Sequence, residues 1–209
     1  AHEIRNPLAS IKGYTQMAVR EIDAKGDAYH DLGIVLKEVD RLDRLVDRFL
    51  SFASPNTPSY AWGDMNQLIS ESIKVLSQQI QEKKIRVVLE LDQAAYFEYD
   101  ADQMKQVLLN LLINAIQASV DGGVIKLCTA LNSTEQKYVL SITNGGERID
   151  PELKSRIFTP FFTTRATGSG LGLAICARII ENHHGTIELV NSNDTDTTIV
   201  ISLPTKKGL

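Results

Sequence analysis

The residues with the clearest chemical potential lie at the N-terminus, in the heptapeptide HEIRNPL (2–8). An exposed imidazole near its ordinary pKa of ~6.5 is largely neutral at cellular pH, and the neutral form is a nucleophile. Glu3 can accept the proton on the other ring nitrogen of His2, and Asn6 lies one helical turn further along the same face. Taken alone, this pattern favours an ordinary surface histidine. Together with the motifs that follow, it predicts that His2 receives phosphate.

Two asparagines on an apolar helix form the second candidate site. Asn110 and Asn114, within QVLLNLLINAIQA (106–118), share one helical face at i and i+4. Buried amides need partners, and Mg²⁺ accepts hard oxygen ligands while taking most of its other contacts from water and substrate phosphates. The pair therefore predicts a magnesium and phosphate site. A pair of hydrogen-bonded core asparagines is the alternative.

A glycine-rich turn, GSGLGLA (168–174), opens a predicted helix. Glycines let the backbone approach a ligand, and the free amides of a helix start attract phosphate. A dinucleotide-binding turn would need a preceding parallel strand and a small residue where Leu173 stands, so we exclude that kind of site. An ordinary flexible turn is the alternative. The candidate phosphate-binding residues are Gly168, Gly170, Leu171 and Gly172.

The segment FTPFFTTR (158–165) lies just before these glycines. Its phenylalanines are suited to anchor a lid, while Thr163, Thr164 and Arg165 reach toward a nucleotide. Arg165 is suited to bind the γ-phosphate, because guanidinium and phosphate form strong paired hydrogen bonds. A solvated lid charge is the alternative interpretation of Arg165.

Composition limits the possible functions. The chain has 209 residues, of which 43% are apolar, with 22 basic and 26 acidic residues and a formal charge of -4. The basic residues form no block, which argues against nucleic acid as a partner. Cys128 and Cys176 lack metal-ligand spacing and are predicted to be small buried hydrophobic residues in a reducing compartment.

The sequence contains no apolar run near the ~18 residues of a membrane helix and no signal peptide. It begins at Ala1, inside a predicted helix. We therefore expect a soluble cytoplasmic fragment of a longer protein, with an upstream sensor region that is compatible with membrane anchoring.

The N-terminal residues 1–54 are predicted to form a helical hairpin. Apolar or small residues recur with a spacing of four and three on both helices, which is the pattern of a coiled-coil seam. A hairpin cannot hide two such seams, so we expect a homodimer whose four helices form a bundle. Packing of the hairpin on its own C-terminal domain is the alternative. The seam residues are Ile4, Leu8, Ile11, Thr15, Ala18 and Ile22, then Leu32, Val35, Val39, Leu42, Val46, Phe49 and Ala53.

Residues 55–63 contain two prolines and no periodicity, which predicts a linker before a second domain, 64–209. Helices and strands alternate irregularly in that domain, which predicts a two-layer α/β sandwich with a mixed sheet. The whole chain is thus α plus α/β. Predicted helices span 64–83, 100–119, 151–157 and 171–183; predicted strands span 85–91, 95–99, 123–131, 137–143, 185–190 and 197–203.

Five motifs, HEIRNPL, NLLINA, NGGERI, FTPFFTT and GSGLGLA, occur in the order of the H, N, G1, F and G2 boxes. The chain thereby resembles sensor histidine kinases of two-component systems over nearly its whole length. Within that family it looks most like sporulation-type kinases of endospore-forming bacteria.

The resemblance implies a phosphotransfer hairpin followed by a Bergerat-type (GHKL) lobe that binds ATP and Mg²⁺. It implies that His2 is phosphorylated, that Glu3 is its general base, and that Asn6 positions water when the kinase dephosphorylates its partner. Asn114 corresponds to the Mg²⁺ ligand, and Asn110 belongs to the same phosphate pocket.

The implied partner is a separate response regulator, because the chain contains no receiver domain. An aspartate of the regulator would take the phosphoryl group from His2, with docking around Lys12, Gly13 and Gln16. The ATP lobe must swing to reach His2, so a protein inhibitor that docks on the hairpin and blocks the swing is a further expected partner.

The G1 motif departs from the family pattern. Aligned on Ile149, it has Asn144 where an aspartate usually accepts a hydrogen bond from adenine, then Gly146, then Arg148 in place of a second glycine. An uncharged acceptor weakens that bond by about 1 kcal/mol, or several-fold in affinity. Arg148 leaves the loop conformation open.

Two other classes of function remain. One is an ATPase or protein-serine kinase on the same nucleotide fold, against which the position of HEIRNPL argues. The other is a non-catalytic dimeric scaffold, in which the changed G1 motif marks a lost site.

Overall fold

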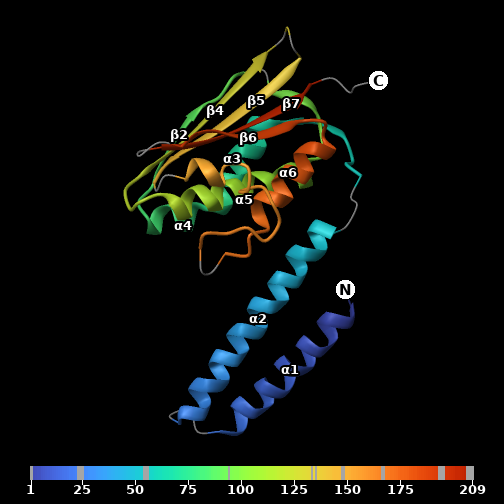
Figure 1. The fold of residues 1–209 in the computed structure, drawn as a ribbon, viewed down its shortest axis with the longest axis vertical. Coiled ribbons are helices and arrows are strands. Elements are labelled where there is room, and N and C mark those ends of the chain that lie inside the picture. Colours follow the sequence, from blue (N-terminus) through green and yellow to red (C-terminus); the bar gives the residue numbers. More distant parts are fainter. Residues whose placement is uncertain are drawn as a thin grey trace. The chain divides into compact units, whose positions relative to one another are not determined.

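The computed structural model divides into two compact units, residues 1–55 and 56–209 (Figure 1). The residues that it describes are 2–22, 26–53, 57–93, 95–132, 134, 136–146, 149–165, 168–192 and 196–205. The side chains of residues 2–5 lie outside this description.

The first unit consists of two helices, α1 (His2–Glu21) and α2 (Asp27–Ala53), which pack against each other. Leu8 and Thr15 of α1 and Val39 of α2 are buried. Lys12 Nζ and Asp40 Oδ1 form an ion pair of 2.8 Å between the helices. The second helix begins earlier than the apolar spacing predicts, because its first turn, with Asp27, carries no seam residue.

The second unit contains a five-stranded sheet with the strand order β2-β4-β5-β7-β6. Strands β2 and β4 are parallel and the other pairs are antiparallel, which confirms the predicted mixed sheet. The strands are β2 (Arg86–Glu90), β4 (Val124–Asn132), β5 (Lys137–Gly145), β6 (Thr186–Ser192) and β7 (Asp196–Pro204).

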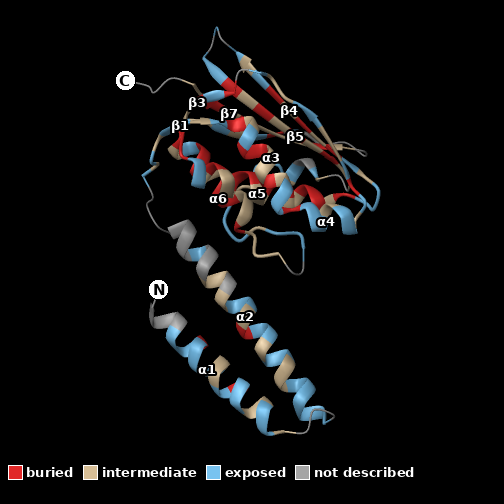
Figure 2. Ribbon diagram, turned by 180° about the vertical axis from the view of Figure 1, so that it is seen from behind, coloured by how far each residue is buried: buried red, intermediate tan, exposed pale blue. Residues whose placement is uncertain are grey.

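Helices cover one face of this sheet (Figure 1). Buried residues concentrate where the helices meet the strands (Figure 2). On β5, Tyr138, Leu140 and Ile142 alternate inward, and on α5 the buried residues recur with helical spacing, so both periodicities bury one apolar side. The helices are α3 (Met65–Val75), α4 (Ser77–Glu82), α5 (Ala101–Ala118) and α6 (Gly172–Asn182), with a 3₁₀ turn η1 (Pro151–Leu153).

The predicted helix 64–83 is two helices. Asp64 caps α3 as expected, accepting hydrogen bonds from the N–H groups of Asn66 and Gln67. At Leu76 the helix breaks, and this residue is almost fully buried while its N–H bonds to Ile73. The predicted helix 151–157 is likewise reduced to η1 and turns.

Strand β1 (Ala61–Asp64) begins within the predicted linker, 55–63, and ends at the first residue of the predicted second domain. It pairs antiparallel with β3 (Tyr96–Tyr99) in a separate two-stranded sheet. The rings of Trp62 and Tyr96 stack with centroids 5.6 Å apart. Because β1 is stabilised by a partner more than thirty residues away in sequence, local periodicity does not indicate it.

The two cysteines differ in environment. Cys176 is fully buried in α6, as predicted. The prediction of burial is wrong for Cys128, which is half-exposed on β4. Its Sγ lies 3.4 Å from Glu90 Oε2, because this position faces the polar, uncovered side of the sheet beside the ion pair Lys126–Glu90.

Candidate functional site

Helix α5 brings the amide pair and the glycine-rich turn together. Asn110 and Asn114 are half-buried on α5, opposite the first residue of α6, Gly172. A Cβ atom built on Gly172 would lie 3.6 Å from Asn110 Oδ1 and 3.9 Å from Asn114 Nδ2. The space that a side chain would occupy at this position therefore faces both amides.

The glycine-rich turn is also packed against the preceding lid segment. Gly170 has a φ of +66°, and a Cβ atom there would overlap the backbone of Phe161. A Cβ atom on Gly168 would overlap the Thr163 hydroxyl. Leu171 is almost fully buried and ends the turn. Glycine is thus required at 170 by close approach to backbone and by conformation, whereas a side chain at 168 would displace the Thr163 hydroxyl.

Arg165 of the lid segment contacts the same helix. Its Nη1 donates to Gln117 Oε1 at 2.6 Å and its Nη2 to Asn114 O at 3.5 Å. Thr163 stabilises the turn, since its Oγ1 accepts from Arg165 N–H at 3.1 Å. Thr163, Thr164 and Arg165 are all exposed. In this structure the guanidinium is thus attached to α5 rather than fully solvated.

The G1 residues follow strand β5 and reach the end of α5. Asn144 is buried, and its Nδ2 donates to Gly145 O at 3.0 Å, which leaves its amide oxygen as the group that could read adenine. Gly146 has a φ of +150°, and a Cβ there would overlap Ala118 O. Arg148 lies outside the described residues.

The histidine motif lies on α1. The backbones of His2 and Glu3 are helical, but their side chains lie outside the described residues. Asn6 is exposed, and its carbonyl accepts from the Ser10 hydroxyl at 3.1 Å.

The amide pair is suited to hold nucleotide-bound Mg²⁺. Within the described ranges, no group of three or more His, Cys, Asp or Glu residues could hold a metal ion. Two partly exposed amides beside a side-chain-free helix start offer a few hard oxygens and room for phosphate, which matches an ion that keeps much of its water and phosphate coordination.

Beneath the amide pair the site is apolar. Cys176 is fully buried, its Sγ donates to Val107 O at 3.8 Å, and burial raises the pKa of its thiol to about 12. The thiol is therefore protonated at neutral pH and acts as a small packing group behind the amide rather than as a nucleophile.

Two residues that contact the site were missed by sequence reasoning. The Gln117 side chain accepts a hydrogen bond from the lid arginine, and the Ala118 carbonyl lies where a Cβ atom on Gly146 would be. Both lie within four residues of Asn114 on α5, and this proximity in sequence could have indicated that they belong to the site. The four segments meet because α5 packs against both α6 and β5.

A mixed sheet covered by helices, with an amide pair, a glycine-rich helix start and a lid arginine that all meet at α5, has the architecture of an α/β-sandwich domain suited to bind a nucleotide. The sequence matches the family of histidine kinase-, DNA gyrase B- and HSP90-like ATPases over residues 99–207. The chain belongs to this family. Residues 1–58 also match the His Kinase A (phospho-acceptor) domain. The prediction of an ATP-dependent protein-histidine kinase is thereby confirmed at the level of the family.

Individual relatives agree with this assignment. Sensor histidine kinase ZraS of Escherichia coli strain K12 is 38% identical over 205 residues, covering 98% of this chain and 44% of that protein. Sporulation kinase D of Bacillus subtilis strain 168 is 29% identical over 206 residues, covering 98% and 40%. The solved structure of histidine kinase ThkA in complex with response regulator protein TrrA aligns with a TM-score of 0.74 and 31% identity, covering 99% of this chain and 60% of that one.

The chain spans less than half the length of these curated relatives. Within the described part of the chain, every helix is too short or too polar to cross a lipid bilayer.

Proposed function

We propose that the chain is the catalytic core of a sensor histidine kinase that phosphorylates His2 from Mg-ATP and passes the phosphoryl group to an aspartate of a response regulator. The observation that carries this proposal is the placement of Gly172 against Asn110 and Asn114, in a chain whose first helix contains HEIRNPL. The same chain thus contains a candidate phosphate-binding site and, in His2, a candidate phosphate acceptor.

The reaction requires positioning and neutralisation of charge more than covalent chemistry. The amide oxygen of Asn114 would hold Mg²⁺, which neutralises phosphate charge when bound, and Asn110 would bind the same phosphates. The amides of the turn 168–172 would bind phosphate, and Arg165, held by its hydrogen bond to Gln117, would bind the γ-phosphate through its remaining N–H donors. Thr163 and Thr164 would add hydroxyl contacts from the lid.

On the acceptor side, neutral His2 would attack the γ-phosphorus while Glu3 accepts the proton of the other ring nitrogen; the bond from the γ-phosphorus to the bridging oxygen would break, and ADP would leave. Asn6 is exposed and would position water when the kinase dephosphorylates its partner regulator. At the adenine end, Asn144 would accept the adenine amino group without charge assistance, so we expect modest ATP affinity.

A homodimer is supported by the exposure of four apolar residues of the hairpin seam. Leu8, Thr15 and Val39 are buried, whereas Ile11 is 47% and Leu42 46% exposed. Val35 and Phe49 extend the exposed stripe at seven-residue spacing on α2. A second copy would cover these residues in a four-helix bundle.

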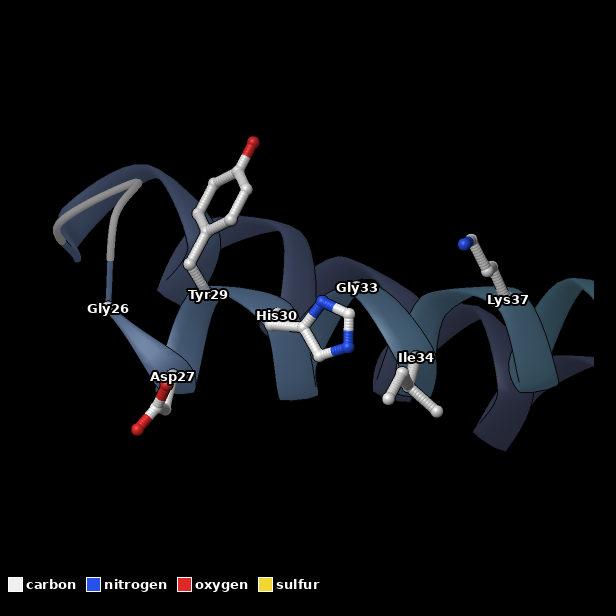
Figure 3. Close-up of a pocket in the computed structure, with 7 residues that line it drawn as sticks. All are labelled: Gly26, Asp27, Tyr29, His30, Gly33, Ile34 and Lys37. Atoms are coloured by element: carbon white, nitrogen blue, oxygen red, sulfur yellow. The ribbon is translucent and has the colours of Figure 1, made fainter.

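The expected protein partners would use the hairpin. A response regulator would dock on α1 around Lys12, Gly13 and Gln16, and the complex of ThkA with TrrA supports this kind of partner. The start of α2 offers a place for an inhibitor, an open hollow of about 480 Å³ (Figure 3). It is lined by Gly26, Asp27, Tyr29, His30, Gly33, Ile34 and Lys37.

A role in sporulation is supported by the similarity to sporulation kinase D, although ZraS is more similar in sequence. A sensor region preceding this chain, with a membrane anchor in the full-length protein, fits relatives that are more than twice as long.

The decisive experiment is incubation of the chain with Mg-ATP labelled on its γ-phosphate. We expect acid-labile, base-stable label that His2→Gln abolishes and His30→Gln, at an exposed histidine of α2, retains. Label that persists in His2→Gln and resists acid would indicate a serine kinase instead. Absence of nucleotide binding would indicate a scaffold.

A further inference from the structure

The C-terminal turn of α5 is held by a lysine from another element. Lys83, the residue that ends α4, is half-buried, and its Nζ donates to three carbonyls: Ile116 at 3.0 Å, Gln117 at 3.3 Å and Ser119 at 3.0 Å. An ammonium group has three N–H donors, so all three are used.

This contact supplies what α5 itself lacks. The last carbonyls of a helix have no partner within the helix, and the partial negative charge there favours a cation. The last turn of α5 contains no basic residue. Lys83 provides both the donors and the positive charge from outside the helix.

The turn that Lys83 holds is the turn on which two parts of the nucleotide site rest. Gln117 accepts the lid hydrogen bond of Arg165, and the Ala118 carbonyl is in close contact with Gly146. Lys83 binds the main chain of residues on both sides of Ala118. A shift of this turn would therefore move the acceptor of the lid arginine.

We propose that Lys83 is a positioning residue of the kinase reaction, which acts through Gln117 on Arg165 and so on the γ-phosphate end of the nucleotide. This inference rests on the proposed function. Lys83 would contact neither substrate nor metal. Its effect on the position of Arg165 would be transmitted by the last turn of α5.

A neighbouring lysine provides a matched control. Lys84 is exposed, and its N–H bonds to Gln81 O as part of the turn after α4. Lys83→Met and Lys84→Met remove the same charge from adjacent positions and keep a side chain of similar length. The main-chain bond from Gly122 N–H to Lys83 O, at 2.8 Å, does not involve the lysine side chain, so in either variant it can still hold the loop between α5 and β4 against the end of α4.

The test is the affinity of the whole chain for a non-hydrolysable ATP analogue and for ADP, each with Mg²⁺. We expect Lys83→Met to weaken binding of the ATP analogue about tenfold and binding of ADP less, because only the former carries the γ-phosphate. Lys84→Met should change neither by more than about twofold, the level of an ordinary surface substitution. Lys83→Arg, which keeps charge and donors, should recover part of the loss.

A second measurement separates positioning from folding. In an Arg165→Met background, Lys83→Met should have little further effect on the ATP analogue, since the two residues act through one turn. Equal losses for ADP and the ATP analogue, or fully additive effects of Lys83→Met and Arg165→Met, would overturn the proposal. Failure of the unmodified chain to bind either nucleotide would instead overturn the proposed function.

Discussion

The backbone N–H of Asp100 donates a hydrogen bond to Nε2 of His183, at 3.2 Å, in the interior of the second unit. Nδ1 of the same ring lies 2.8 Å from Ile179 O. Because Nε2 accepts, Nδ1 must carry the proton, and the ring is the neutral tautomer. Asp100 in turn caps α5 through Gln103 N–H and binds Ser59 N–H at 2.8 Å.

This arrangement predicts a pH-dependent stability. Burial lowers the pKa of His183, opposed by the Ile179 carbonyl and the Asp100 charge and assisted by His184. As the pH falls below 6.5, the unfolded chain binds a proton that the folded chain resists, so the free energy of unfolding falls. One such group contributes at most about 1.4 kcal/mol per pH unit.

Urea denaturation between pH 8 and pH 5, followed by near-ultraviolet circular dichroism of the packed tyrosines, measures this effect. His183→Gln should be less stable at pH 8 by about 1–3 kcal/mol but lose less stability on acidification. His184→Gln, at an exposed neighbour that makes the smallest contribution to the His183 pKa shift, should keep most of the pH dependence. An unchanged slope in His183→Gln would assign the acid sensitivity to other groups.

Asn114→Ala should remove the metal dependence of nucleotide binding. We expect phosphorylation of His2 to fall roughly 100-fold, which corresponds to about 2.7 kcal/mol. Alanine favours a helix, so α5 should remain folded. Calorimetric titration with an ATP analogue, with and without Mg²⁺, checks this, and Lys105→Ala on the same helix is the control. Full metal dependence in Asn114→Ala would assign the Mg²⁺ ligand elsewhere.

Gly170→Ala should disturb the lid and the glycine-rich turn together. Its φ of +66° costs an alanine about 1–2 kcal/mol, and the added Cβ must displace the Phe161 backbone. We expect loss of ATP-analogue binding and a lower urea midpoint. Gly172→Ala is the comparison for stability, because its Cβ would be in ordinary contact and alanine favours the first turn of α6. Equal destabilisation by both substitutions would contradict the packing described here.

Leu42→Glu should dissociate the proposed dimer. Leu42 is 46% exposed in the single hairpin, and burial of a leucine contributes about 1.5–3 kcal/mol per copy. Light scattering coupled to size exclusion should give the monomer mass for Leu42→Glu and the dimer mass for Gln16→Glu, at an exposed position of α1. A monomeric unmodified chain would remove the basis of the bundle.

The sequence predicts features that depend on neighbouring residues. Asp64 as a helix cap, the i, i+4 relation of Asn110 and Asn114, and the helix after Gly170 are all encoded within one or two turns. The mixed sheet also follows from the irregular order of helices and strands.

Long-range contacts were not predictable in the same way. No local pattern predicts that Trp62 stacks on Tyr96, or that Arg165 binds a glutamine 48 residues earlier. The break at Leu76 likewise depends on the burial of that side chain in the assembled core. Such features are set by packing after the elements have formed, and they include the lid geometry on which the site depends.

The fully enclosed position of Cys176 has a practical consequence for spectroscopy. Its thiol is inaccessible to maleimides while the protein is folded, whereas Cys128 is half-exposed on the sheet face away from α5. Burial and Glu90 raise the pKa of the Cys128 thiol, so coupling needs mildly alkaline buffer. A fluorophore can therefore be attached at one defined point of the folded chain without engineering, and nucleotide binding can be followed by energy transfer from a second dye on the nucleotide.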